Sequence, residues 1–91
     1  MNYEALSDDE LNARISELTG VAADYAHDCA AMLKLWFGIV GFSLQAGARL
    51  WRIIWETEPD GQIWTWNIDP ARGMAEVWIE YQDYLKTRGK R

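Results

Sequence analysis

The sequence predicts an α+β domain in which a small antiparallel sheet with a central hairpin is flanked by helices. Three local patterns support this prediction. A capping box begins a helix at Ser7, a Pro-Asp-Gly turn at 59–61 separates two apolar runs, and Asp69 followed by Pro70 begins a last helix. The expected order of elements is α-α-β-β-β-α, and the 91 residues are expected to form a single domain, 1–91.

The first helix is predicted from its two ends. Ser7 supplies a hydroxyl at the N-cap, and Glu10 supplies a carboxylate three residues later, so each can accept from the other's backbone amide. Gly20 is a natural helix end. Between these ends the apolar residues fall at helical spacing, at Leu11, Ile15 and Leu18.

A second helix is expected from Ala22 to Phe37, before Gly38 and Gly41 break the helical period. Its apolar stripe would consist of Tyr25, Cys29, Met32, Leu33 and Trp36. Residues 42–45 then form a candidate short first strand, and Gly47 is expected to turn the chain toward the hairpin.

The hairpin is expected to pair strands near 49–57 and 62–68 across the turn at 58–61. The last helix follows with Pro70 at its first position and runs to about Thr87. Its core face should include Met74, Ala75, Trp78 and Leu85. Six tryptophans are many for a chain of this length, and most of them are expected to lie in the core.

The hairpin strands are apolar on both faces, which is unusual for a sheet with one side open to water. One face of the first strand carries Trp51, Ile53 and Trp55. The opposite face combines apolar and charged side chains, and the returning strand adds Trp64, Trp66 and Ile68 to one of its own faces. Either helices cover both sides, as in an αβα sandwich, or one face is a binding surface.

The candidate protein-binding residues are Arg52, Glu56, Trp64 and Trp66. A core face seldom mixes arginine and glutamate with tryptophan, whereas the centres of protein interfaces are enriched in tryptophan and arginine. The competing interpretation is that a helix covers this face and the arginine stem lies over an aromatic ring. The prediction also depends on strand register, because a slip of one residue moves both tryptophans to the other side.

Composition argues against several classes of partner. The net charge of −5 disfavours a nucleic-acid binder that relies on a basic surface. The longest apolar stretch, 29–42, is shorter than the ~20 residues needed to span a bilayer. Cys29 is the only cysteine, so no internal disulfide can form, and a reducing compartment is expected. The amino-terminal residues do not have the pattern of a signal peptide.

Catalytic and metal sites are not predicted. Asp24, His27 and Asp28 have the i, i+3, i+4 spacing of a shared helical face, but without a ligand from elsewhere they are expected to be a solvated polar face. Glu76 and Glu80 are expected to be solvated as well. The chain contains no P-loop, dinucleotide fingerprint, HEXXH or GXSXG motif. The expectation is a protein without enzymatic activity, metal or cofactor.

Two segments resemble a family of small proteins known as the phage ABA sandwich domain. The opening residues 1–12, Met-Asn-Tyr-Glu-Ala-Leu-Ser-Asp-Asp-Glu-Leu-Asn, are similar to the start of that family. Residues 67–75 resemble its closing Asn-x-x-Pro-x-Arg-Ala-Met motif, with Gly73 in place of the usual alanine. Residues 24–28 are a weaker match to its Asp-Tyr-Cys-Asn stretch, and the usual proline between helix and sheet is missing from 29–47. Together these segments cover about a third of the chain.

The resemblance implies a phage or prophage accessory protein of the host cytoplasm, with helices on both faces of its sheet and no attached activity. Two functions fit this expectation. The first is binding of a host protein, as an inhibitor of a defence system or of other host machinery. The second is self-association, in which the aromatic face forms a homodimer. Neither function involves a membrane or direct contact with nucleic acid.

Overall fold

The computed structural model describes residues 3–57 and 61–89. The elements follow the predicted α-α-β-β-β-α order, which confirms the α+β class, with one additional 3₁₀ turn at the start. They are η1 (Tyr3–Ala5), α1 (Asp8–Thr19), α2 (Cys29–Trp36), β1 (Phe42–Ala46), β2 (Trp51–Thr57), β3 (Gly61–Asn67) and α3 (Pro70–Gly89). The predicted turn at 58–61 falls mainly on residues 58–60, which lie outside the described residues.

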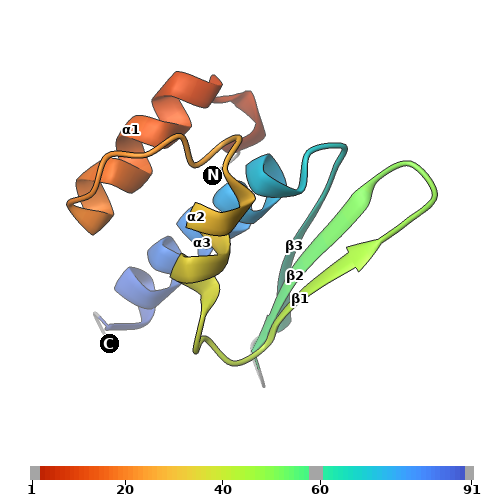
Figure 1. The fold of residues 1–91 in the computed structure, drawn as a ribbon. Helices are drawn as coiled ribbons and strands as arrows, with labels where there is room; N and C mark the ends of the chain where they lie inside the picture. The colour runs from red at the N-terminus through yellow and green to blue at the C-terminus, as the bar shows by residue number, and fades with distance from the viewer. Residues whose placement is uncertain (1–2, 58–60, 90–91) are drawn as a thin grey trace.

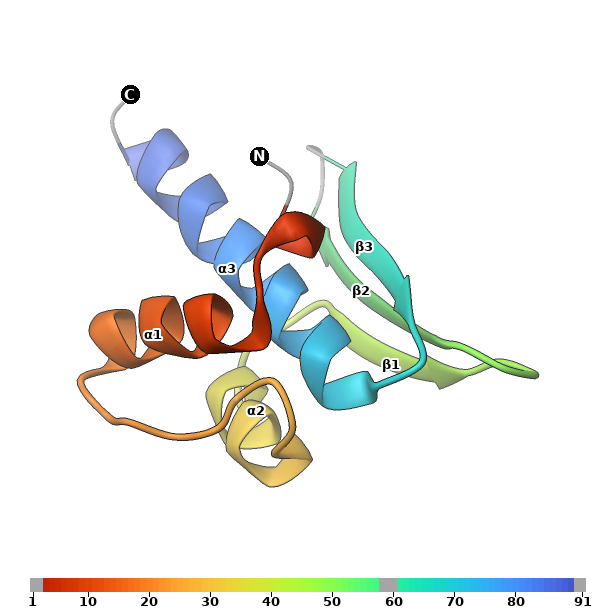
Figure 2. The ribbon, with the colours of Figure 1, turned by 90° about the horizontal axis from the view of Figure 1, so that it is seen from above.

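The three strands form one antiparallel sheet in the order β1-β2-β3, and the helices of the described residues lie on one side of it (Figures 1 and 2). Helix α3 packs directly on β2 and β3, and α1, α2 and η1 pack on α3. The expectation that helices cover both faces of the sheet, as in an αβα sandwich, is therefore wrong. The described helices surround α3, so none of them reaches the second face of the sheet.

The predicted caps of α1 and α3 are present. The Glu10 amide donates to Ser7 Oγ and the Ser7 amide donates to Glu10 Oε1, each over 3.1 Å. Gly20 is the C-cap of α1, and its amide donates to the Ser16 carbonyl over 2.8 Å. At the start of α3, Asp69 Oδ1 accepts from the Ala71 amide over 2.9 Å. Each bond satisfies a terminal backbone group that the helix itself leaves without a partner.

Helix α2 is shorter than predicted, because it begins at Cys29 rather than at Ala22. Asp28 is its N-cap and accepts from the Ala31 amide over 3.2 Å. The segment before α2 is bonded to α1 instead. The Ala26 amide donates to Oδ1 of Asn12, a residue of α1, over 2.8 Å. Residues 21–28 therefore form a loop despite their alanine content.

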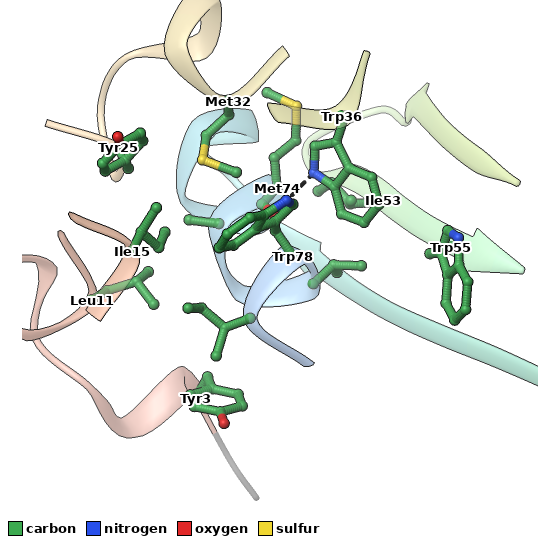
Figure 3. Packing of buried hydrophobic residues seen from close by; sticks show 13 residues of the cluster. Tyr3, Leu11, Ile15, Tyr25, Met32, Trp36, Ile53, Trp55, Met74 and Trp78 are labelled. Atoms are coloured by element: carbon green, nitrogen blue, oxygen red, sulfur yellow. Dashed lines mark hydrogen bonds between the residues drawn. The ribbon is translucent and has the colours of Figure 1, made fainter. Parts of the chain in front are cut away.

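The core lies between α3 and the elements around it, and Figure 3 shows its side chains. Trp36 is fixed there by a hydrogen bond from Nε1 to the Met74 carbonyl, 3.2 Å long, and by stacking on Phe42 at 4.4 Å between ring centroids. Three of the six tryptophans are buried, namely Trp36, Trp55 and Trp78. Trp51 is partly buried and packs against the same core, whereas Trp64 and Trp66 are exposed.

Helix α3 is buried all round over most of its first half. The consecutive residues 73–79 are all buried, since the sheet lies on one side and α1 and α2 lie on the other. Gly73 sits where α3 crosses β2, and a Cβ atom there would overlap the terminal methyl group of the buried Ile53. The glycine that costs the helix intrinsic stability therefore allows α3 to approach the sheet closely.

Candidate functional site

The second face of the sheet is a surface that no described helix covers. The strand register gives the Cα pairs Arg52 with Trp66, Ile54 with Trp64, and Glu56 with Gln62. Because alternate side chains share a face, these six side chains lie on the face opposite α3. We call this surface the open face; β1 adds Ser43 and Gln45 to it.

The two tryptophans of the open face are substantially exposed. Trp64 is 50% exposed and Trp66 is 47% exposed. Their rings meet edge to face, with centroids 6.4 Å apart and planes at 87°. Ile54 lies beside them and is only 3% exposed, so the neighbouring side chains of the face shield it from water. The result is an aromatic surface around a buried aliphatic centre.

Arg52 lies against both rings. Its guanidinium carbon is 5.7 Å from the Trp64 centroid and 5.5 Å from the Trp66 centroid, within the range of cation–π attraction. The arginine Nε is buried and has no hydrogen-bond partner among residues 3–57 and 61–89. The two rings thus shield part of the guanidinium from water. No acceptor among the described residues replaces water at Nε.

Glu56 stands apart from the other three candidate residues. It lies on the opposite side of Ile54 from Arg52, and its Oε1 accepts from Gln62 Nε2 over 2.9 Å. The structure therefore brings Arg52, Trp64 and Trp66 into contact and leaves Glu56 at the other end of the same face. That they bind a protein remains a prediction.

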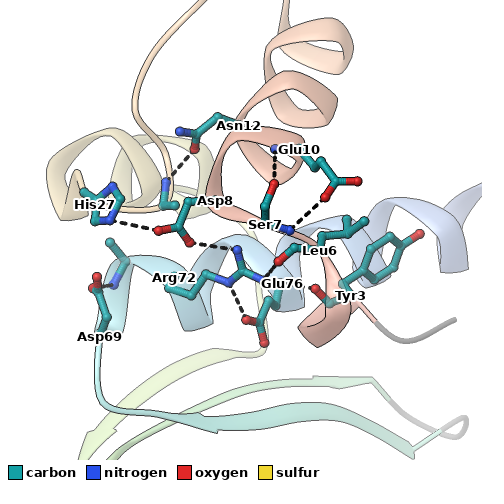
Figure 4. Close-up of polar contacts among 12 residues, drawn as sticks. Tyr3, Leu6, Ser7, Asp8, Glu10, Asn12, His27, Asp69, Arg72 and Glu76 are labelled. Atoms are coloured by element: carbon teal, nitrogen blue, oxygen red, sulfur yellow. Dashed lines mark hydrogen bonds and ion pairs between the residues drawn. The ribbon is translucent and has the colours of Figure 1, made fainter.

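His27, the only histidine, bridges two carboxylates from a turn rather than from the predicted helix. Its Nε2 is 3.0 Å from Asp8 Oδ2 (Figure 4). Its Nδ1 is 2.9 Å from Asp24 Oδ1. The hydrogen bond to Asp24 raises the pKa of His27 above its ordinary value and lowers the pKa of Asp24. Asp28 is occupied as the cap of α2. No group of three or more metal-ligating side chains is formed by the described residues.

The raised pKa of His27 predicts a pH-dependent stability. A raised folded pKa stabilises the fold below the unfolded value near 6.5, and this contribution disappears as pH rises through the folded value. The groups facing the imidazole are Asp8, Asp24 and Asp69, and Arg72 shares Asp8 with it. We therefore expect the melting temperature to fall between about pH 5.5 and about pH 8.5 by more in the wild type than in His27→Gln. If the melting temperature changes with pH by the same amount in both proteins, the bridge between His27 and the two carboxylates does not contribute to stability.

Arg72 and Glu76 form an ion pair that sequence reasoning missed. Arg72 Nε donates to Glu76 Oε2 over 2.7 Å, and both side chains are largely buried. The expectation that Glu76 is solvated is wrong because α3 is enclosed on all sides at this level. Arg72 also bonds to Asp8 Oδ1 over 2.9 Å, and to the carbonyls of Leu6 and Tyr3 over 2.6 and 3.2 Å (Figure 4). These bonds join η1 and the start of α1 to α3.

Two hollows of the surface are lined by described residues. One of about 460 Å³ lies between the end of α1, the 21–28 loop and α2, and most of its lining is apolar. Another of about 310 Å³ contains Tyr3, whose hydroxyl donates to Asp83. Burial, followed by the Asp83 carboxylate, raises the pKa of Tyr3 to about 12, so this phenol holds its proton at ordinary pH.

Comparison of the chain with protein-family models, with curated proteins and with solved structures found no match. In the described residues, no helix is both long and apolar enough to cross a membrane. The open face therefore stands as the candidate site on its own geometry.

Proposed function

We propose that this protein acts by binding another protein through the open face of its sheet, without catalysing a reaction. The observation that carries the proposal is the pair Trp64 and Trp66, each about half exposed on a sheet face that no described helix covers. Exposed apolar patches of this kind mark interaction sites. Arg52, stacked on both rings, adds the residue type that accompanies tryptophan at interface centres.

The wider setting of the proposal comes from the family resemblance. In that setting the chain is a phage or prophage accessory protein of the host cytoplasm, and its partner is a host protein that it inhibits. The net charge of −5 supports a basic partner, such as a protein that itself binds nucleic acid. The alternative partner is a second copy of the chain, in which case the protein acts as a homodimer.

The test is to separate binding from stability with single substitutions. We expect Trp64→Ala to weaken partner binding by at least about tenfold, because buried tryptophan side chains often carry much of the binding energy of an interface, and truncation to alanine removes it. Its melting temperature should change little, since half of the side chain is already in water. Arg52→Glu should weaken binding as well. Phe37→Ala is the matched control, because Phe37 is 90% exposed but lies outside the open face.

Binding is measured in two assays on the same four proteins. One is capture of identified host proteins from lysate, scored by which of them are lost with Trp64→Ala and kept with Phe37→Ala. The other is self-association, measured by sedimentation. If Trp64→Ala and Arg52→Glu keep full binding in both assays and only Trp64→Ala unfolds, the hairpin is scaffold and the proposal is wrong.

A further inference from the structure

The open face carries opposite charges on the two sides of one aliphatic residue. Arg52, Ile54 and Glu56 alternate along β2, and their side chains share the open face. Two residues of a strand span about 6.6 Å, so the Cα atoms of Arg52 and Glu56 are about 13 Å apart. In the described structure Glu56 accepts from Gln62 and not from Arg52. A strand with a cation and an anion placed symmetrically about its centre is complementary to its own reverse.

We propose that the partner of the open face is a second copy of this chain, docked face to face about a two-fold axis beside Ile54. This inference rests on the proposed binding role of the open face and develops its alternative partner, a second copy of the chain, in place of a host protein. An axis lying between the two sheets and across the strands reverses the direction of β2 in the second copy. Each Arg52 then faces Glu56 of the second copy, and each Glu56 faces its Arg52.

The same axis places the aromatic groups consistently. Trp64 pairs with Ile54 in the register, so it lies at the level of the axis and meets Trp64 of the second copy. Trp66 lies at the level of Arg52, and it therefore meets Gln62 of the second copy, which is the neighbour of Glu56. Aromatic rings are in this way covered by an aromatic or an amide group, and no like charges are brought together.

Within the described residues, Arg52 lacks a hydrogen-bond acceptor and a counter-charge that a second copy could supply. Its guanidinium lies against two rings, its Nε is buried without an acceptor, and no carboxylate pairs with it in the part of the chain that the structure describes. Removing a charged group from water is costly unless a counter-charge and hydrogen bonds compensate. A carboxylate facing the guanidinium supplies a charge-assisted bond, and Glu56 of the second copy is the carboxylate that the symmetry delivers.

The size of the face sets the expected strength of the dimer. The sheet has one strand of five residues and two of seven. Its face spans on the order of 300 Å² in plan, whereas a stable interface buries about 800 Å² on each partner. Leu50 directly precedes β2 and Ile68 directly follows β3, and both are exposed. We therefore expect a weak dimer that forms at high protein concentration. Salt near 0.15 M screens the repulsion between two chains of net charge −5 beyond about 8 Å and leaves the close ion pairs less affected.

The experiment is a charge exchange measured by sedimentation equilibrium from about 1 μM to about 1 mM at about 0.15 M salt. Arg52→Glu and Glu56→Arg should each weaken self-association by at least about tenfold, because like charges then face each other at two symmetric places. The double variant Arg52→Glu/Glu56→Arg should recover most of that loss, since the pair is restored with its signs reversed. Glu56→Arg is the cleaner single variant, because it keeps the arginine on the tryptophan rings.

The outcomes separate this inference from the proposed function. A wild type that stays monomeric throughout, or a double variant as weak as the singles, overturns docking of a second copy. If host-protein capture then still depends on Trp64, the open face keeps its role with a different partner. If the wild type dimerises and Trp64→Ala leaves its dissociation constant unchanged, the dimer forms elsewhere and the inference also fails. Circular dichroism of each variant verifies that it is folded.

Discussion

Replacing Trp78 by alanine is expected to lower the free energy of unfolding by about 3–5 kcal/mol. Trp78 is 6% exposed and belongs to the core cluster that α3 shares with α1, α2 and β2 (Figure 3). Truncation would leave a cavity among Leu11, Ile15, Met32 and their neighbours, and this cavity adds to the lost burial of the ring. Small domains have total stabilities of about 5–15 kcal/mol, so a loss of this size removes a large share of the fold's stability.

Urea unfolding followed by circular dichroism measures this loss, and Trp66→Ala is the control. Trp66 is of the same residue type but lies on the open face, about half exposed, so its truncation should cost much less. Trp78→Phe should fall between the two, because it keeps an aromatic ring and removes an indole N–H that has no acceptor among the described residues. A Trp78→Ala protein that unfolds at the wild-type urea concentration would refute the packing of α3.

Both ends of α1, the start of α3 and the two faces of the hairpin could be predicted because short-range chemistry determines them. The capping box at Ser7, the Asp69-Pro70 start of α3 and the alternation along β2 each depend on neighbours within a few residues. Alternation alone does not fix the register of the two strands, but with the observed register it places Trp64 and Trp66 on the same face as Arg52. The candidate surface could therefore be listed from the sequence, although its exposure could not.

The start of α2 could not be predicted because interactions with another element decide it. Residues 22–26 are rich in alanine, which favours a helix. In the structure the Asn12 side chain of α1 accepts from the Ala26 amide and donates to Asp24 Oδ1, and each hydrogen bond is 2.8 Å long. The Tyr25 hydroxyl donates to the Val21 carbonyl over 2.6 Å. These bonds satisfy polar groups of the segment in a loop conformation, so the weak intrinsic preference for helix is overridden.

The exposure of the open face follows from where the helices go. Coverage of both sheet faces would require a helix on the side opposite α3. Helices α1 and α2 instead pack on α3. A signal for this was present: in 74–79 the only charged residue is Glu76, which indicates a helix buried all round rather than an amphipathic one. A central helix of this kind leaves the far side of a three-stranded sheet without a cover.

Arg72→Met is expected to destabilise the fold by about 3–5 kcal/mol, the usual cost of removing one partner of a buried ion pair. The side chain of Arg72 is 11% exposed and that of Glu76 is 5% exposed. The substitution leaves the buried Glu76 carboxylate without its cation and removes the donor to the Leu6 and Tyr3 carbonyls. Arg14→Met is the control, because Arg14 is exposed and lies over the Tyr3 ring at 5.4 Å, a contact worth about 1 kcal/mol or less.

The double variant Arg72→Met/Glu76→Gln separates the two parts of this cost. Neutralising Glu76 removes the charge that Arg72→Met leaves buried, so the double variant should be more stable than Arg72→Met alone. It should not reach the wild type, because the carbonyls of Tyr3 and Leu6 and the carboxylate of Asp8 still lack the guanidinium that joins them to α3. Both variants are measured by urea unfolding against the wild type. Full recovery in the double variant would show that the attachment of η1 and α1 contributes nothing, and no recovery would show that the charge of Glu76 is not the source of the loss.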